Sequence, residues 1–175
     1  MINTNTEEFD AEYAESKQNR ARVIKELKEK GLPLYGWRCV GWEDTGSADS
    51  TCQLCGITKV RFLHHMENYI TGDELFVGCY CAGGMENNLH AARERERLNI
   101  NRLNRKYRFD SQEWHCRSEY GNIYYSLFYK RKRLAIIKSK YGYFGYRINN
   151  SPWKWRYLSF EQARDALFAA LDEMR

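Results

Sequence analysis

Cys52-Gln-Leu-Cys55-Gly56 and Gly78-Cys79-Tyr80-Cys81-Ala82 are two tightly spaced pairs, and they hold four of the six cysteines of this 175-residue chain. A zinc ion takes four soft ligands in a tetrahedron, and two short turns can each supply two of them. We therefore expect a structural Zn²⁺ site with Cys52, Cys55, Cys79 and Cys81 as ligands. Between the pairs lies Arg61-Phe-Leu-His64-His65-Met, so His64 or His65 is a candidate substitute for one cysteine.

The sequence alone leaves other interpretations of the cysteines open. Four reduced, buried cysteines without a metal are one alternative, because free cysteine is often buried. A catalytic zinc is less favoured, because such sites usually keep three protein ligands and an open water position. Disulfides are disfavoured because the start of the chain is not a signal peptide. Cys39 and Cys116 have no close partner in the sequence and are expected in the core.

The overall composition is that of a folded protein. Hydrophobic residues make up 43% and aromatic residues 15% of the chain, enough for one compact domain or two small ones. No apolar run approaches the length of a membrane span, so we expect a cytoplasmic protein without a membrane partner. The sequence shows no Gly-rich phosphate loop, no nucleophile elbow and no carboxylate set spaced as in a nuclease, so we do not expect an enzyme.

The hydrophobic patterns and turn signals predict an α+β fold in three segments. The segments are an N-terminal helix (1–33), a zinc-binding module with a basic helix (34–110) and an antiparallel sheet with a C-terminal helix (111–175). The first two segments contain a helix at 6–30, a strand at 34–42, a zinc-clasped hairpin of strands at 59–64 and 74–77, and the basic helix at 85–108. The last segment contains five strands, near 113–118, 122–130, 133–139, 143–148 and 153–158, and a helix at 160–174 that Ser159 caps.

The charge is unevenly distributed along the chain. Residues 1–51 carry 7 Lys and Arg against 10 Asp and Glu, and residues 52–90 carry 2 against 4. Residues 91–175 carry 19 against 9, so the positive charge lies in the C-terminal half. Lysine and arginine neutralise phosphates, and aromatic side chains can stack on bases, so nucleic acid (DNA or RNA) is the expected partner. The expected contact residues are Arg93, Arg97, Arg102, Arg105, Lys106, Arg108, Lys130, Arg131, Lys132, Arg133 and Tyr143.

Two other interpretations of this basic, aromatic half remain. Arg93-Glu-Arg-Glu-Arg97 can be a solvated helix with internal ion pairs, and about half of the aromatic residues must face the core, because strand side chains alternate. A protein partner is the second interpretation, in which the chain is an inhibitor or adaptor that docks on a nucleic-acid-handling complex. Tyrosine, tryptophan and arginine also dominate protein interfaces. Salt-dependent binding to nucleic acid would separate the two functions.

Most of the chain resembles a family of small bacterial and mobile-element proteins that are mostly uncharacterised. The shared pattern is Cys-x-Leu-Cys, an Arg-aromatic-x-His segment, Val-Gly-Cys-x-Cys-Ala and an Arg/Glu-rich helix; here these are Cys52–Cys55, Arg61–His64, Val77–Ala82 and Arg93–Leu98. Similar proteins tend to have His-Pro where this chain has Asn68-Tyr69. The resemblance implies a zinc-finger-like module and no particular reaction.

Overall fold

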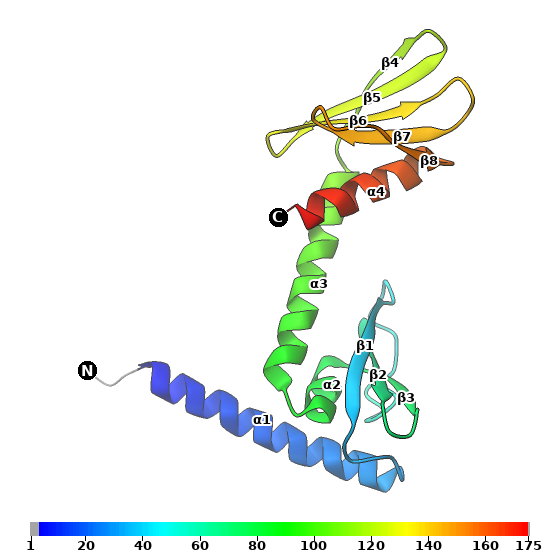
Figure 1. Cartoon of the computed structure of the whole chain (residues 1–175). Helices are drawn as coiled ribbons and strands as arrows, with labels where there is room; N and C mark the ends of the chain where they lie inside the picture. Colours follow the sequence, from blue (N-terminus) through cyan, green and yellow to red (C-terminus); the bar gives the residue numbers. More distant parts are fainter. Residues whose placement is uncertain (1–3, 175) are drawn as a thin grey trace. The chain divides into compact units, whose positions relative to one another are not determined.

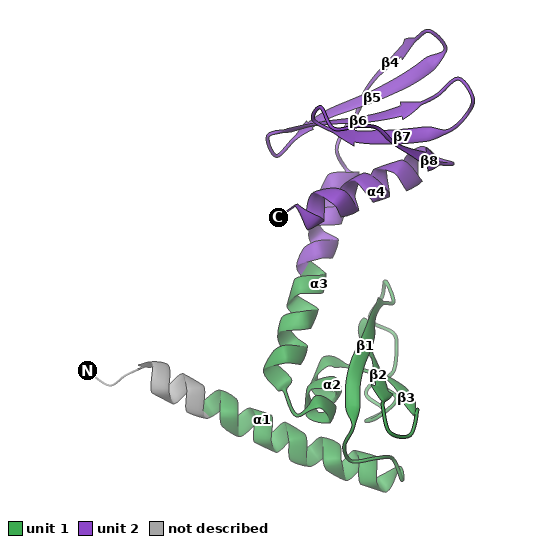
Figure 2. Cartoon of the chain, in the orientation of Figure 1, with its two compact units in different colours: residues 1–100 green, residues 101–175 purple. Residues whose placement is uncertain are grey.

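The chain is divided into two compact units (Figure 2). The computed structural model describes the backbone of residues 4–174 and the side chains of residues 11–174. Unit 1 comprises residues 1–100 and unit 2 residues 101–175, so the division falls within a helix, α3 (Leu89–Asp110). With four helices, a three-stranded antiparallel sheet and a five-stranded antiparallel sheet among the described residues, the α+β prediction is confirmed (Figure 1).

Unit 1 is built around a small sheet and two helices that pack on each other. Its elements are α1 (Thr4–Glu29), β1 (Trp37–Asp44), β2 (Phe62–Asn68), β3 (Glu74–Val77), α2 (Cys79–Glu86) and the first part of α3. The strands pair antiparallel in the order β1-β2-β3. The core includes the buried side chains of Val23, Leu27, Leu54, Met66, Val77 and Ala82. This packing holds α2, and the two cysteines in it, against α1 and the sheet.

Two sequence expectations in unit 1 were wrong in detail. The single helix at 85–108 is two helices, because Asn87 adopts a left-handed conformation (φ 56°) that ends α2. The Asn88 side chain then accepts a hydrogen bond from the Ala91 backbone N–H (2.9 Å), which caps the start of α3. The strand at 59–64 is β2, which begins only at Phe62 after Lys59 takes a positive φ of 67°. Since β1 pairs with β2, the result is a three-stranded sheet in place of an isolated hairpin.

Unit 2 is an antiparallel meander closed by a helix. Strands β4 (His115–Glu119), β5 (Asn122–Tyr129), β6 (Lys132–Lys138), β7 (Phe144–Ile148) and β8 (Lys154–Tyr157) pair in sequence order, and α4 (Phe160–Glu173) follows. Ser159 accepts a hydrogen bond from the Gln162 N–H (3.1 Å), which confirms the expected cap. Phe109, Leu134, Ile136, Tyr146, Leu167 and Phe168 form its core. Cys116 was expected in the core but is exposed on β4, an edge strand.

No helix in the described part of the chain is both long enough and apolar enough to cross a membrane.

Candidate functional site

The four paired cysteines line one cavity of about 410 Å³ in unit 1. Cys52 and Cys55 lie in the loop between β1 and β2, where Gly56 follows with a positive φ of 71° that favours glycine. Cys79 and Cys81 lie in the first turn of α2, directly after Gly78. Arg22 from α1 and Glu96 from α3 also line the cavity, together with Lys59, Arg61 and Tyr80. One loop and one helix, separated in the sequence by β2 and β3, therefore bring the cysteines together.

Three of these cysteines form a group that could hold a metal ion. The sulfur atoms of Cys52, Cys55 and Cys81 all lie within 4.8 Å of one another, and Cys52 and Cys81 are buried. The Arg22 guanidinium donates a hydrogen bond to Cys81 Sγ (3.5 Å). A close cluster of soft thiolate donors suits zinc, and a cationic neighbour balances part of the negative charge of such a cluster.

Thiol ionisation within the group is uneven. The Cys81 thiol hydrogen-bonds to the Cys52 sulfur, and the backbone N–H groups of Cys55, Gly78 and Leu54 also point to it, so that the pKa of Cys52 is lowered despite burial. The same contact with Cys52, together with burial, raises the pKa of Cys81. Backbone N–H groups directed at a cysteine sulfur are also a feature of metal-binding turns.

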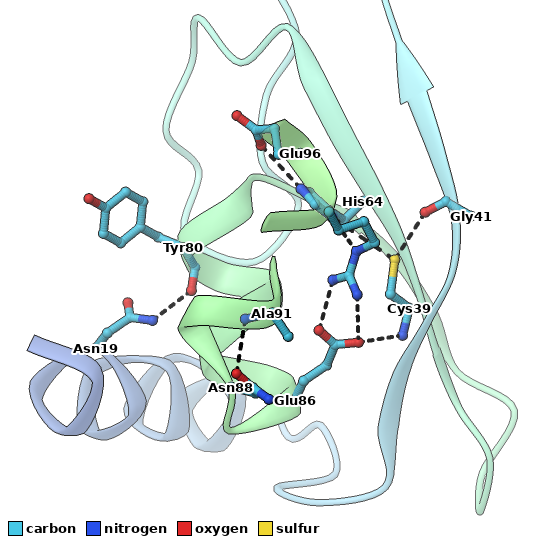
Figure 3. A network of polar contacts seen from close by, with 10 residues as sticks. Asn19, Cys39, Gly41, His64, Tyr80, Glu86, Asn88, Ala91 and Glu96 are labelled. Carbon is cyan, nitrogen blue, oxygen red and sulfur yellow. Dashed lines mark hydrogen bonds and ion pairs between the residues drawn. The ribbon is translucent and has the colours of Figure 1, made fainter. Parts of the chain in front are cut away.

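The fourth predicted ligand, Cys79, belongs to a second group. Its sulfur lies within 4.8 Å of ligand atoms of His64 and Glu96, so this group could also hold a metal ion. Burial, followed by the negative charge of Glu96, raises the pKa of Cys79 to about 12. His64, from β2, is fully buried, and its Nε2 lies 3.1 Å from Glu96 Oε2 (Figure 3).

Hydrogen bonds to both ring nitrogens of His64 define its role in this arrangement. Arg95 Nε donates to His64 Nδ1 (3.3 Å), so Nδ1 accepts and Nε2 carries the ring proton that is donated to Glu96. Both ring nitrogens of His64 therefore have protein partners, so Nε2 would have to give up its contact with Glu96 before it could bind a metal ion. His65 belongs to neither group: it lies on the other side of β2, stacks on Phe76 and contacts Glu74 (3.1 Å).

A polar network beside the cavity holds α3 to the sheet, and sequence reasoning missed it. Glu86 accepts a hydrogen bond from Arg95 (2.8 Å) and another from the Cys39 backbone N–H (2.9 Å), while Asn19 donates to the Tyr80 carbonyl (2.8 Å) (Figure 3). In the sequence, Asn19, Glu86 and Arg95 cannot be distinguished from the solvent-exposed polar residues of a helix. Only their positions across four elements reveal the network.

Most cations of the predicted basic helix are engaged in ion pairs. In unit 1, Arg93 contacts Glu15, Arg95 contacts Glu86 and Arg97 contacts Glu94. In unit 2, Arg102 and Arg105 share Asp172 (3.1 and 2.7 Å), and Lys106 lies between Asp110 and Asp165. Arg108 is exposed and has no ion pair with the described residues. The helix is therefore largely neutralised by its own surroundings, as the solvated-helix interpretation expected for Arg97.

Strands β5 to β8 of unit 2 differ from α3, because their cations are not paired with carboxylates in the described part of the structure. From Tyr120 to Phe160, a span that includes β5 to β8, the chain has nine Lys and Arg and neither Asp nor Glu. Within the described residues none of the nine forms an ion pair; five lie over aromatic rings instead, at 4.7 to 5.8 Å from the ring centroids. Unlike α3, this surface keeps its positive charge.

The remaining predicted contact residues lie at the two ends of this strand surface. Lys130 and Arg131 are the exposed tip of the β5–β6 hairpin, and Arg133 is exposed at the start of β6. Lys132 is half-buried and lines a cavity of about 210 Å³ with Arg105, Phe168 and Asp172. Tyr143 is exposed in the turn between β6 and β7, where its carbonyl accepts from the Ser139 N–H.

No protein-family model, curated protein or solved structure matches this chain. The resemblance to the bacterial and mobile-element family stays a prediction, and a function has to be argued from the arrangement of the residues. One detail of that resemblance has a structural explanation here. Asn68, where similar proteins tend to have histidine, is fully buried; its side chain donates to the Tyr35 carbonyl (2.7 Å) and accepts from the N–H groups of Ile70 and Thr71.

Proposed function

We propose that this chain is a nucleic-acid-binding accessory or regulatory protein whose unit 1 is stabilised by one structural zinc ion. The observation that supports nucleic-acid binding is the span from Tyr120 to Phe160, with nine cations, no carboxylate and no ion pair to the described residues. Unpaired lysine and arginine side chains on one sheet are available to neutralise phosphates and release counterions. Binding is assigned chiefly to unit 2, with the β5–β6 hairpin as its centre.

The support for zinc is the donor set of the unit 1 cavity. Cys52, Cys55 and Cys81 supply three sulfur ligands, and Cys79 is the fourth thiol of the same cavity. His64 is occupied by Arg95 and Glu96, so Cys79 is the better fourth ligand. When bound, the ion cross-links the β1–β2 loop to α2; its binding energy is then part of the folding energy of unit 1.

Charge reversal at the hairpin tip tests nucleic-acid binding. Lys130→Glu with Arg131→Glu is expected to weaken binding to a labelled oligonucleotide at least tenfold. The slope of log K against log salt concentration should also become shallower, by an amount that corresponds to up to about two fewer released counterions. The measurement is fluorescence anisotropy across a salt series. Lys28→Glu with Lys30→Glu is the matched control, because it changes the net charge equally on exposed residues of unit 1.

Unchanged affinity and salt slope in the hairpin variant would refute the assignment to this hairpin. If the wild-type protein fails to bind DNA or RNA even at low salt, the nucleic-acid function itself is wrong, and the protein-binding alternative gains support.

The backbone of the same hairpin predicts a trade-off between stability and binding. Lys130 and Arg131 have φ values of 48° and 63°, a two-residue turn for which Asn-Gly is the favoured sequence. The preceding hairpin uses Gly121 at the equivalent second position. Lys130→Asn with Arg131→Gly is therefore expected to stabilise unit 2 by about 1 kcal/mol and to weaken nucleic-acid binding. Thermal unfolding and anisotropy check both effects; a less stable variant would contradict the strain argument.

A further inference from the structure

One face of the five-stranded sheet is free of the helix that closes unit 2. Tyr125, Leu127 and Tyr129 of β5 pack into the core with α4, as do Leu134 and Ile136 of β6. Figure 1 shows α4 along one side of this sheet. Because strand side chains alternate, the intervening residues point to the opposite side, which we call the outer face. No described element of unit 2 covers the outer face.

The outer face combines aromatic rings with arginines. Its aromatic residues include Tyr124 and Phe128 of β5, Trp155 of β8 and Trp153, which directly precedes β8, and Phe128 is 70% exposed. Arg117 of β4, Arg133 of β6 and Arg147 of β7 are its cations, by their register opposite Tyr124, Phe128 and Ala135. Glu119, 3.8 Å from Arg117, adds one carboxylate at the β4 edge. The net charge of this face is therefore positive.

Small residues lower the outer face at two places, while Ile137 of β6, between Tyr124 and Gly145, is buried. Ser126 of β5 pairs with Ala135 of β6, and Gly145 of β7 lies opposite Trp155 of β8. A Cβ atom at Gly145 would lie 2.7 Å from Trp155 Cε3, so the indole lies directly against the backbone of β7. The Trp155 indole is therefore held in a fixed position on the sheet, where a second aromatic ring could stack on it.

Aromatic and cationic groups on this face are also held in place by each other. The Arg117 guanidinium carbon lies 5.1 Å from the Tyr124 ring centroid, and that of Arg147 lies 4.7 Å from the Trp153 ring centroid. The Trp153 and Trp155 centroids are 5.8 Å apart. Tyr124, Trp153 and Trp155 thus each have a cation or a second ring beside them, and Phe128 has Arg133 as its partner on the neighbouring strand, so that groups able to bind phosphates lie next to groups able to stack on bases.

We propose that the outer face binds single-stranded nucleic acid, with unpaired bases stacked on Phe128 and Trp155 and phosphates on Arg133 and Arg147. This inference rests on the proposed function and specifies its ligand. A duplex hides the faces of its bases, so it can use the arginines but not the rings. The hairpin cations Lys130 and Arg131 lie next to Phe128 and Arg133 and extend the positive charge of the outer face to the tip of the β5–β6 hairpin.

The test compares strand state and ring removal in the full zinc-loaded chain. The probes are labelled oligonucleotides of about 15 nucleotides, as single-stranded DNA, single-stranded RNA and duplex DNA. Phe128→Leu and Trp155→Leu are each expected to lower single-strand affinity about fivefold or more and to leave duplex affinity unchanged. Tyr107→Leu, an exposed aromatic residue on α3, is the control that leaves all affinities unchanged.

The outcomes separate this inference from the function on which it rests. If duplex binds as tightly as single strands, or if Phe128→Leu changes nothing while the hairpin charge reversal still abolishes binding, then stacking is refuted and nucleic-acid binding stands. Absence of binding to every probe refutes both. Because Phe128 is largely exposed, its replacement by leucine does not remove core contacts, and the result does not depend on the stability of the Trp155 variant.

Discussion

Replacing Cys52 with serine is expected to abolish zinc binding and to unfold unit 1 while unit 2 stays folded. Cys52 is the sulfur to which three backbone N–H groups and Cys81 point, and serine cannot supply a thiolate there. Structural zinc contributes about 10–16 kcal/mol to the folding of small zinc modules, which is as large as the whole stability of a typical domain. Metal content by elemental analysis and amide hydrogen exchange, which resolves the two units, measure the effect.

Cys116→Ser is the matched control for this prediction. Cys116 is exposed on β4 in unit 2, so this variant is expected to keep its metal and its stability. Cys79→Ser extends the test to the fourth ligand: the four-cysteine site predicts metal loss close to that of Cys52→Ser. His64→Gln is expected to retain the metal. A Cys52→Ser protein that folds without metal, with wild-type hydrogen exchange in unit 1, would contradict the structural zinc.

Replacing Gly84 with alanine is expected to destabilise unit 1 by about 2 kcal/mol, even though alanine favours helices. Gly84 lies in α2 three residues after Cys81, and its missing side chain admits Val23 of α1. A Cβ atom there would overlap with Val23 Cγ2 and would lie 2.7 Å from Val23 Cβ. Val23 is fully buried, so it has no space into which to move. The clash outweighs the gain in helix propensity of about 1 kcal/mol.

Chemical denaturation of the zinc-loaded protein measures this loss, together with the rate at which a chelator removes zinc. Separation of α1 from α2 also moves Arg22 away from Cys81, so metal loss is expected to be faster than in the wild type. Gly78→Ala is the matched control, because its new Cβ would meet only Val60, at 3.6 Å, an ordinary contact distance. Equal stability of the Gly84 and Gly78 variants would show that α1 can shift without cost.

The elements of unit 2 could be predicted almost completely from the sequence. Its five strands and closing helix follow from local signals, such as the Gly121 turn and the Ser159 cap, that depend little on distant residues. In unit 1 the expected helix at 85–108 was interrupted at Asn87, and the expected strand at 59–64 was displaced by the turn at Lys59. Lysine rarely adopts a positive φ, so the sequence gives little warning at Lys59, whereas Asn87 is of a type that tolerates the left-handed region and was a weak signal of a helix end.

The sequence identified the four cysteines and His64 of the candidate site, but not Glu96 and not the way these residues are grouped. Spacing alone treats Cys79 and Cys81 as equivalent members of a pair. In the helical turn of α2, however, residues two apart point in different directions, so Cys81 meets Cys52 and Cys55 while Cys79 faces His64 and Glu96. Glu96 comes from α3, and no spacing rule connects it to the cysteines.

The sequence by itself determined the α+β class, the cysteines that could bind a metal ion and the excess of positive charge in the C-terminal half, because local periodicity, ligand spacing and composition do not depend on how distant segments meet. Only the tertiary structure decided which charges remain available. Arg102 and Arg105 share Asp172 of α4, about 70 residues away, whereas Lys130 and Arg131 find no carboxylate among the described residues. Ion pairing acts over a few ångströms in space. The number of cations in α3 is therefore evident from the sequence, but their pairing with carboxylates is evident only from the tertiary structure.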